Sequence, residues 1–511
     1  MTDGSVSSTG VTVRPDEPAP TMQSRDPRTG RVLGTFADMD PAAVAARVDR
    51  ARQVQPDWAA RSPAERGRHL LRIRAALVDA GPDITRLAAE ETGKQQATAY
   101  FELFAACAML TWASRNVERA LRPERRSSYP VASKRVWVDY APFGVVGVIP
   151  PWNYPVGIPF QSLPYALGAG NTAVMKPSEL ATLTGQRLAE AVNAAGIELV
   201  QLVTGGAKAG DALVRAPVDM IAFTGSPATA RHILRSAAES LTPVLLELGG
   251  KDPMVVAPDA DPRRAARAAT AAAFFNAGQT CMSTERAIVC DPLQDEFVRH
   301  AATIARSVRL GPGDDSQVGP LTRADQVPIL ESRIADAVAK GATLVAGGRT
   351  RTDLGRGGWL EPTVLDGVTP EMDIFHLESF GPILSVVRAR DVEEAVRLAN
   401  DSQMGLTSSV FTADRATGRA IAAQLEAGGV NINDVMLGAA MAAVPFGGNK
   451  DSGFGRLQGV EGFRAFSQSR AVTEDRLPGM SPMISMMFHG KRLPSPRTLQ
   501  RALRAMFGRG R

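Results

Sequence analysis

A cysteine in a polar, glycine-containing segment is the residue in this chain best suited to nucleophilic chemistry. Cys281 lies within Asn276-Ala-Gly-Gln-Thr-Cys-Met-Ser283, whereas Cys290 follows an apolar run typical of a structural thiol. Glycine lets backbone approach a ligand closely, and loops of this kind carry reactive groups. Because a lone intracellular cysteine is more often a passive free thiol than a nucleophile, Cys281 needs support from other residues.

Two further segments supply groups that a nucleophilic thiol needs. Leu246-Glu-Leu-Gly-Gly-Lys-Asp-Pro253 places the carboxylate of Glu247 beside a Gly-Gly turn, and Pro150-Pro-Trp-Asn-Tyr-Pro155 holds the amide of Asn153 between prolines. A thiol, a carboxylate and an amide can serve as nucleophile, general base and oxyanion donor. Together these segments favour a nucleophilic Cys281 over a passive one.

Seven short motifs in one order carry a family resemblance. They are Pro151-Trp-Asn-Tyr-Pro155, Met175-Lys-Pro-Ser-Glu179, Phe223-Thr-Gly-Ser226, Glu247-Leu-Gly-Gly-Lys251, Gly278-Gln-Thr-Cys281, Glu378-Ser-Phe-Gly-Pro382 and Pro445-Phe-Gly-Gly-Asn-Lys450. The chain resembles the NAD(P)-dependent aldehyde dehydrogenases from about residue 25 to about residue 475. The motifs are specific to this superfamily and much less specific for a substrate.

The resemblance implies oxidation of an aldehyde to a carboxylic acid through a thiohemiacetal and a thioester on Cys281. The Asn153 side chain and the Cys281 backbone N–H would hold the oxyanion, and Glu247 would activate the water that hydrolyses the thioester. Relatives that transfer the acyl group to coenzyme A typically lack this glutamate, so Glu247 favours the free acid. Lys176 is expected to assist electrostatically.

The cofactor that the resemblance implies is NAD, although the G-x-G-x-x-G fingerprint is missing. Lys176 and Glu179 would contact the adenosine ribose, and Glu179 favours NAD over NADP because a carboxylate repels a 2′-phosphate. The alternative for these two residues is an ordinary surface ion pair.

The pyrophosphate is expected at the start of a helix, next to Gly225 and Ser226. The family motif has a glycine four residues after this serine, where Ala230 stands here. The remaining cofactor contacts are expected from Trp152, Glu378 and Phe380.

A tunnel for the aldehyde is expected after Asn153. Its lining should include Tyr154, Ile158, Gln161, Met282 and Phe446. Family members that act on succinate semialdehyde often carry an arginine at a position like Gln161, and the opposite wall, residues 435–443, holds no cation. The sequence therefore favours a medium or long apolar aldehyde, aliphatic or aromatic.

Two alternatives remain beside this function. The first is a semialdehyde dehydrogenase such as succinate-semialdehyde dehydrogenase. The second is a catalytically silent structural or binding relative, which is disfavoured because Cys281, Glu247 and Asn153 are all present.

Short apolar strands that alternate with helical patterns predict an α/β fold with a doubly wound parallel sheet. The strands are expected at 144–149, 172–175, 199–203, 220–223 and 244–247, and a second α/β unit begins near Pro253. The expected division is residues 25–125 with 143–252 for the NAD-binding domain, 253–464 for the catalytic domain, and 126–142 with 465–477 for an arm. In the family this β arm mediates oligomerisation, which implies a homodimer or homotetramer.

Composition limits the location and partners of the chain. Three cysteines among 511 residues cannot form a disulfide framework, which favours a cytoplasmic protein. No zinc motif, signal peptide or membrane span is evident. Seven Lys and Arg residues lie within 491–511, and without them the net charge of +5 becomes −2. The basic charge therefore belongs to a tail, and no nucleic-acid partner is expected.

The two termini lie outside the family resemblance. Residues 1–24 are rich in Ser, Thr and Pro and are expected to be disordered. In the tail, 478–511, Ser495 and Pro496 can start a helix with leucines on one face and arginines on the other, which suits weak peripheral contact with an anionic membrane. The alternative for the tail is an oligomer-packing arm or a disordered segment.

Overall fold

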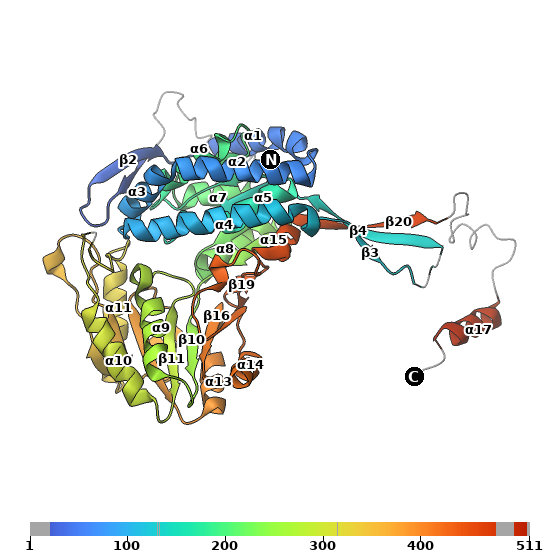
Figure 1. The fold of residues 1–511 in the computed structure, drawn as a ribbon. Helices are drawn as coiled ribbons and strands as arrows, with labels where there is room; N and C mark the ends of the chain where they lie inside the picture. Colours follow the sequence, from blue (N-terminus) through green and yellow to red (C-terminus); the bar gives the residue numbers. More distant parts are fainter. Residues whose placement is uncertain (1–20, 130, 132, 314, 477–494, 508–511) are drawn as a thin grey trace, which may run out of the picture. The chain divides into compact units, whose positions relative to one another are not determined.

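The computed structural model describes residues 21–129, 131, 133–313, 315–476 and 495–507 (Figure 1). The chain divides into two compact units, Met1–Leu121 with Ala141–Gln468, and Arg122–Tyr140 with Ser469–Arg511. Most of the segment expected to be disordered lies outside the described residues. Its last four residues belong to strand β1 (Thr21–Arg25), which pairs with β2 (Val32–Ala37), so the boundary expected at 24 is wrong.

The first sheet of the larger unit has the order β19-β9-β8-β5-β6-β7. Its parallel strands are β5 (Val145–Ile149), β6 (Thr172–Met175), β7 (Val200–Leu202), β8 (Met220–Thr224) and β9 (Val244–Glu247). All five were predicted, since a parallel sheet covered on both faces needs continuous apolar strands. The sixth strand, β19 (Gly453–Phe454), pairs antiparallel with β9.

The second sheet has the order β12-β13-β14-β11-β10-β16-β17. Its strands are β10 (Asp252–Val256), β11 (Thr284–Cys290), β12 (Thr343–Ala346), β13 (Thr363–Asp366), β14 (Ile383–Ala389), β16 (Thr407–Phe411) and β17 (Gly429–Ile432). All neighbouring pairs are parallel except β12 with β13. These observations confirm the doubly wound α/β fold.

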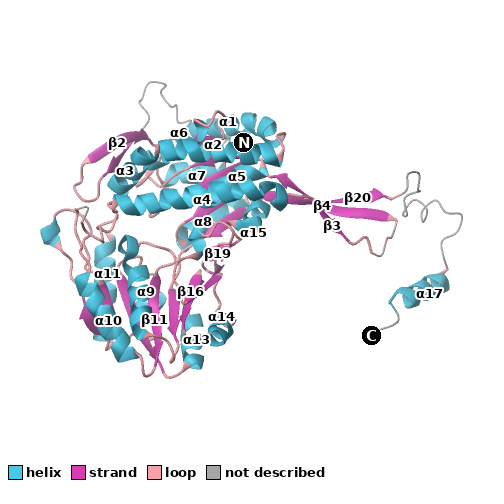
Figure 2. Ribbon diagram, in the orientation of Figure 1, coloured by secondary structure: helices cyan, strands magenta, loops and turns pink. Residues whose placement is uncertain are grey.

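Helices cover both sheets, as Figure 2 shows. Around the first sheet lie α1 (Pro41–Ala59), α2 (Pro63–Asp79), α3 (Gly81–Thr92), α4 (Gln96–Ala120), α5 (Gly157–Ala169), α6 (Thr182–Asn193), α7 (Ala207–Arg215) and α8 (Pro227–Ala238). Around the second lie α9 (Pro262–Phe274), α10 (Gln294–Ser307), α11 (Gln326–Ala339), α13 (Val392–Asn400) and α14 (Arg415–Ala422). Side chains cap α1 and α2: Asp40 accepts from the Ala43 N–H, and Ser62 forms a capping box with Glu65.

After the second sheet, the chain returns to the first sheet at residues 453–465. After β19, helix α15 (Gly459–Ala465) packs Phe463 against Tyr165 of α5, with ring centroids 5.1 Å apart. The boundary predicted at residue 464 is therefore too late, because residues 453–465 pack with the cofactor-domain elements. Short strands such as β19 carry too few residues for a periodic signal.

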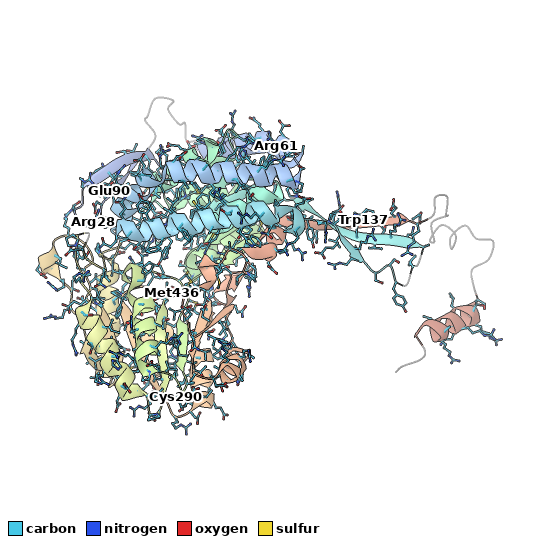
Figure 3. All side chains as sticks on the ribbon, viewed as in Figure 1. Arg28, Arg61, Glu90, Trp137, Cys290 and Met436 are labelled. Atoms are coloured by element: carbon cyan, nitrogen blue, oxygen red, sulfur yellow. The ribbon has the colours of Figure 1, made fainter. Side chains whose placement is uncertain are left out.

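The smaller unit holds a three-stranded sheet in the order β20-β4-β3. Its strands are β3 (Glu124–Arg126), β4 (Lys134–Pro142), on which Figure 3 labels Trp137, and β20 (Ser467–Asp475). Lys134 and Asp475 form an ion pair of 2.5 Å within this unit. The strands confirm the predicted β structure, whereas the oligomerisation role stays a prediction.

Helix α17 (Pro496–Phe507) confirms the predicted helical tail. Ser495 Oγ accepts from the Thr498 N–H at 3.2 Å, which is the expected cap. Leu499 and Leu503 are exposed. Residues 477–494 and 508–511 lie outside the described residues, as do the side chains of Met506 and Phe507. Of the helices that the structure describes, none has the length and apolarity needed to cross a membrane.

Candidate active site

An apolar cavity of about 410 Å³ brings the predicted nucleophile, base and tunnel together. Cys281 and Glu247 line it, and so do all five residues expected in the tunnel. Those are Tyr154, Ile158, Gln161, Met282 and Phe446. Met436, which Figure 3 labels, lines it too, while Cys290 lies at the opposite end of the second sheet.

The loop before Cys281 is strained. Asn276, Ala277 and Gly278 all have positive φ, at 54°, 57° and 72°. Only glycine adopts that region without cost, so neighbouring contacts must hold the loop. A Cβ at Gly278 would lie 2.1 Å from the Gly381 carbonyl oxygen, and Gln279 Oε1 accepts from the Thr322 N–H at 2.9 Å. These contacts fix the backbone just ahead of the thiol.

The surroundings of Cys281 disfavour its thiolate form. Burial raises its pKa far above the usual value, and the nearby carboxyl groups of Asp252, Glu247 and Glu378 raise it further. A thiol is a weak nucleophile, since the thiolate is the reactive form. Nucleophilic attack by Cys281 therefore requires a base that takes its proton.

Glu247 is a buried carboxyl group with free oxygens. Its side chain is buried, and neither Oε1 nor Oε2 has a hydrogen-bond partner in the described part of the chain. Burial raises the pKa of Glu247 well above its ordinary value, and Arg456 offsets this only in part. The strand end of β9, pinned by β19 at Gly453, fixes where this carboxyl points. A carboxyl with a raised pKa next to a thiol is suited to proton transfer at neutral pH.

Asn153 is held by contacts on both its side chain and its carbonyl. The side-chain Nδ2 donates to the Gln279 carbonyl at 2.9 Å, two residues before Cys281. The Asn153 carbonyl accepts from Lys94 Nζ at 2.6 Å and from Asn276 Nδ2 at 3.0 Å. The amide thus faces the cysteine loop and retains a second N–H to donate.

The sequence reasoning missed Lys94 and Glu102, a buried pair behind this loop. Lys94 Nζ and Glu102 Oε1 lie 2.5 Å apart, and Glu102 Oε2 accepts from the N–H groups of Val156 and Gly157 at 2.9 and 3.0 Å. The pair therefore ties the start of α5 to Asn153. In the sequence, Glu91-Thr-Gly-Lys94 resembles a stretch of the family but is too short to predict a role for Lys94. Glu102 stands in a helical pattern, and nothing in the sequence marks it as a partner of Lys94.

A second cavity of about 360 Å³ also contains Cys281 and Asn153. Five predicted cofactor residues line it: Trp152, Gly225, Ser226, Glu378 and Phe380. The rings of Trp152 and Phe380 meet edge to face, with centroids 5.7 Å apart. Arg323 and Arg333, which the sequence reasoning missed, line it as well. Cys281 therefore lies where the two cavities meet.

The residues of this second cavity fit a dinucleotide. Ser226 caps α8, whose free N–H groups at the N-terminus suit a pyrophosphate. A Cβ at Gly249 would lie 2.4 Å from Glu378 Oε2, so a side chain there would displace the Glu378 carboxyl group. Burial raises the pKa of Glu378 to about 8, and its Oε1 accepts from the Gly250 N–H at 3.0 Å. That carboxyl group offers hydrogen bonds to a sugar hydroxyl.

The predicted catalytic and cofactor residue Lys176 lies elsewhere. Neither Lys176 nor Glu179 is among the described residues that line the two cavities. Lys176 Nζ lies 3.8 Å from Glu179 Oε2 and donates to the Pro177 carbonyl at 3.1 Å. Lys176 is buried, so it does not form the surface ion pair that stood as the alternative, and its roles at the cofactor and at Cys281 stay predictions. Ala230 is buried in α8 and packs within the core of the first sheet.

Comparison with known proteins identifies the family. Residues 13–472 match the model of the aldehyde dehydrogenase family. The chain belongs to the aldehyde dehydrogenase family. A crystal structure of an NAD-dependent aldehyde dehydrogenase from Sinorhizobium meliloti matches this aldehyde dehydrogenase with a TM-score of 0.86 and 33% identity, covering 91% of this chain and 93% of that one.

Two curated relatives of this aldehyde dehydrogenase have different names. A protein of Mycolicibacterium smegmatis named "Putative succinate-semialdehyde dehydrogenase [NADP(+)]" is 37% identical over 90% of this chain and 89% of the relative. A 4,4'-diapolycopene aldehyde oxidase of Methylomonas sp is 35% identical over 90% of this chain and 87% of the relative. The names span short and long aldehydes, so the family alone does not fix the substrate.

Proposed function

We propose that this aldehyde dehydrogenase oxidises a medium or long apolar aldehyde to its carboxylic acid with NAD. The observation that carries the substrate class is the charge of the aldehyde cavity: its only charged lining residues, among those the structure describes, are Glu102 and Glu247. A cavity that offers carboxyl groups and no cation disfavours a substrate carboxylate next to the reacting end. The relative named for a diapolycopene aldehyde supports the same class.

The protein's own groups supply the covalent steps. Glu247 takes the proton of Cys281, directly or through water, and the thiolate adds to the aldehyde carbon. The Asn153 amide and the Cys281 N–H hold the resulting oxyanion, where one such donor contributes about 3–4 kcal/mol. After the thiohemiacetal is oxidised to a thioester and Glu247 has lost the thiol proton to solvent, Glu247 takes a proton from the water that releases the acid, and that proton returns to the Cys281 sulfur.

The dinucleotide would be held at the second cavity by Gly225, Ser226, Glu378 and Phe380 beside Trp152. When bound, NAD supplies the acceptor for the hydride of the aldehyde carbon. The preference for NAD rests on Glu179, whose carboxylate would repel a 2′-phosphate. The Mycolicibacterium relative carries NADP in its name, so the preference needs its own test.

Succinate-semialdehyde dehydrogenase is the second candidate function. The relative from Mycolicibacterium smegmatis favours it by name. Gln161, where the resemblance places an arginine in such enzymes, lines the cavity as a neutral amide. That observation ranks it below the apolar aldehyde.

NADH production across matched aldehydes tests the proposal. Decanal and benzaldehyde are expected to give higher kcat/KM than succinate semialdehyde, and butanal serves as the uncharged control of matched length. Cys281→Ala is expected to lose dehydrogenase activity with every aldehyde while NAD binding persists. Higher kcat/KM for succinate semialdehyde than for butanal would favour the second candidate.

A further inference from the structure

A large groove between helices of the second sheet lies next to the aldehyde cavity. The groove has a volume of about 610 Å³ and is lined mainly by residues of α9 and α10, which pack side by side (Figure 1). Ala271 and Phe275 line both the groove and the cavity that contains Cys281. The two hollows are therefore neighbours that share one wall.

The groove combines an apolar surface with cations. Phe274, Ile304 and Val308 provide apolar lining, while Arg263 and Arg267 contribute guanidinium groups. None of the lining residues is an Asp or Glu, and neither arginine has an ion-pair partner in the part of the chain that the structure describes. The third basic residue, His300, lies 3.3 Å from Glu296. An arginine fork without a carboxylate is suited to bind one.

Helix geometry relates the cations to the shared wall. Arg267 precedes Ala271 by one turn and Arg263 precedes it by two, so the three residues share one face of α9. At a rise of 1.5 Å per residue, the arginines lie about 6 and about 12 Å along the helix from Ala271. An acyl chain that leaves the cavity past the small side chain of Ala271 would meet them in turn.

We propose that this groove is a second subsite, which receives the far end of a long aldehyde and binds a terminal anionic group at Arg267 and Arg263. The inference rests on the proposed function and extends its substrate class from long apolar aldehydes to long ω-oxo acids, whose carboxylate lies beyond the apolar cavity. The apolar cavity takes the chain next to the aldehyde, and the groove takes the carboxylate beyond it. A short semialdehyde cannot reach the arginines, because its carboxylate stays inside the cavity.

Turnover of matched substrates tests the subsite. We expect a lower KM for ω-oxodecanoate than for decanal, and the Arg263→Gln/Arg267→Gln variant should raise the KM of ω-oxodecanoate about tenfold or more. The KM of decanal and both kcat values should stay unchanged. Arg299→Gln, an exposed arginine of α10 outside the groove, is the matched control.

A binding measurement separates the subsite from the proposed function. Calorimetry with ω-hydroxydecanoate and decanediol needs no turnover. The full-length protein should bind the hydroxy acid more tightly than the diol, with a difference that disappears in the double arginine variant and shrinks with added salt. Ala271→Phe, which fills the shared wall, should weaken binding of the hydroxy acid.

Each result decides the subsite. Equal affinity for the hydroxy acid and the diol, or an arginine effect no larger than that of Arg299→Gln, would overturn it. Absence of NADH with every aldehyde, together with arginine-dependent binding of the hydroxy acid, would overturn the proposed function and keep the subsite.

Discussion

At the residue scale, Glu247 is held in a place that destabilises its charged form. Its oxygens are buried and have no hydrogen-bond partner among the described residues, and its pKa is raised well above 4.5. Charging a buried carboxyl group costs free energy. Carboxyl groups with raised pKa values of this kind are concentrated at functional sites, which fits the predicted role of Glu247 as a base. The charged form of Glu247, the predicted base, should therefore lower the stability of the protein by a measurable amount.

Glu247→Gln should stabilise the protein at neutral pH. Because the folded pKa is raised, the folded state binds more protons than the unfolded state between 4.5 and that pKa, so wild-type stability falls as pH rises through this window. Glutamine has no such titration. Thermal unfolding should therefore give a higher Tm for the variant at neutral pH and nearly equal Tm values near pH 4.5. A lower Tm of the variant at neutral pH would contradict the claim that burial destabilises the charged form of Glu247.

The sequence predicted a shared site for Cys281, Glu247 and Asn153 because short motifs carry these residues with their chemistry, and the structure brings them to two adjoining cavities. Lys94 and Glu102 were not identified as a pair, since they make contact only after α3 and α4 fold together. Lys176 Nζ lies 3.8 Å from Glu179 Oε2, three residues along the chain, and its predicted role at the active site stays a prediction. A motif fixes local backbone, but distant contacts decide where a long side chain points.

At the scale of elements, the Lys94–Glu102 pair connects the end of α3 and the start of α4 to the Asn153 loop. Lys94→Met alone would leave a buried unpaired carboxylate, which costs about 3–5 kcal/mol. The double variant Lys94→Met/Glu102→Gln removes both charges. It should fold and show a kcat about tenfold lower with little change in KM, because Asn153 loses the contact that positions it.

The control for this prediction is Arg86→Gln, which breaks an exposed pair with Glu90 on α3 and should leave kcat unchanged. A double variant with wild-type kcat would show that the buried pair stabilises the fold without positioning Asn153.

The connection from β6 to α6 carries the proposed discrimination between cofactors. Glu179 lies after the strand end at Met175, and its side chain is partly exposed. Glu179→Thr should raise the ratio of kcat/KM with NADP to that with NAD, since a repelling carboxylate is removed. Steady-state rates with both cofactors measure this ratio. An unchanged ratio would mean that Glu179 does not face the ribose.

The strands of both sheets were predictable because apolar runs between turn residues give a strong local signal. The two-residue strand β19 and the return of α15 to the first sheet were not, since their positions depend on pairing with β9 and packing on α5. The domain boundary near residue 464 therefore could not be placed from the sequence, because it depends on these tertiary contacts.

At the scale of the whole molecule, the tail and the arm are predicted to bind partners. Helix α17 exposes Leu499 and Leu503 and carries Arg497, Arg501 and Arg504. A basic amphipathic helix of this kind suits the surface of an anionic membrane. The homodimer or homotetramer and the cytoplasmic location stay predictions.

Truncation after Arg476 should remove weak, salt-sensitive binding to anionic vesicles and leave the turnover of butanal unchanged. Co-sedimentation of the full-length and truncated proteins with vesicles of anionic and of neutral lipid measures this. Equal binding by both proteins, or no binding by the full-length protein at low salt, would exclude the tail as an anchor.

In the proposed mechanism, Cys281 carries the acyl group and Glu247 activates the water that removes it. The direct measurement is mass spectrometry of Glu247→Gln after incubation with decanal and NAD and a quench in acid. A decanoyl group is expected on the peptide that contains Cys281, formed with a burst of NADH because loss of the base slows deacylation more than it slows formation of the thioester. A variant that turns over as fast as wild type without an acyl group, or that carries the group on Cys107 or Cys290, would contradict it.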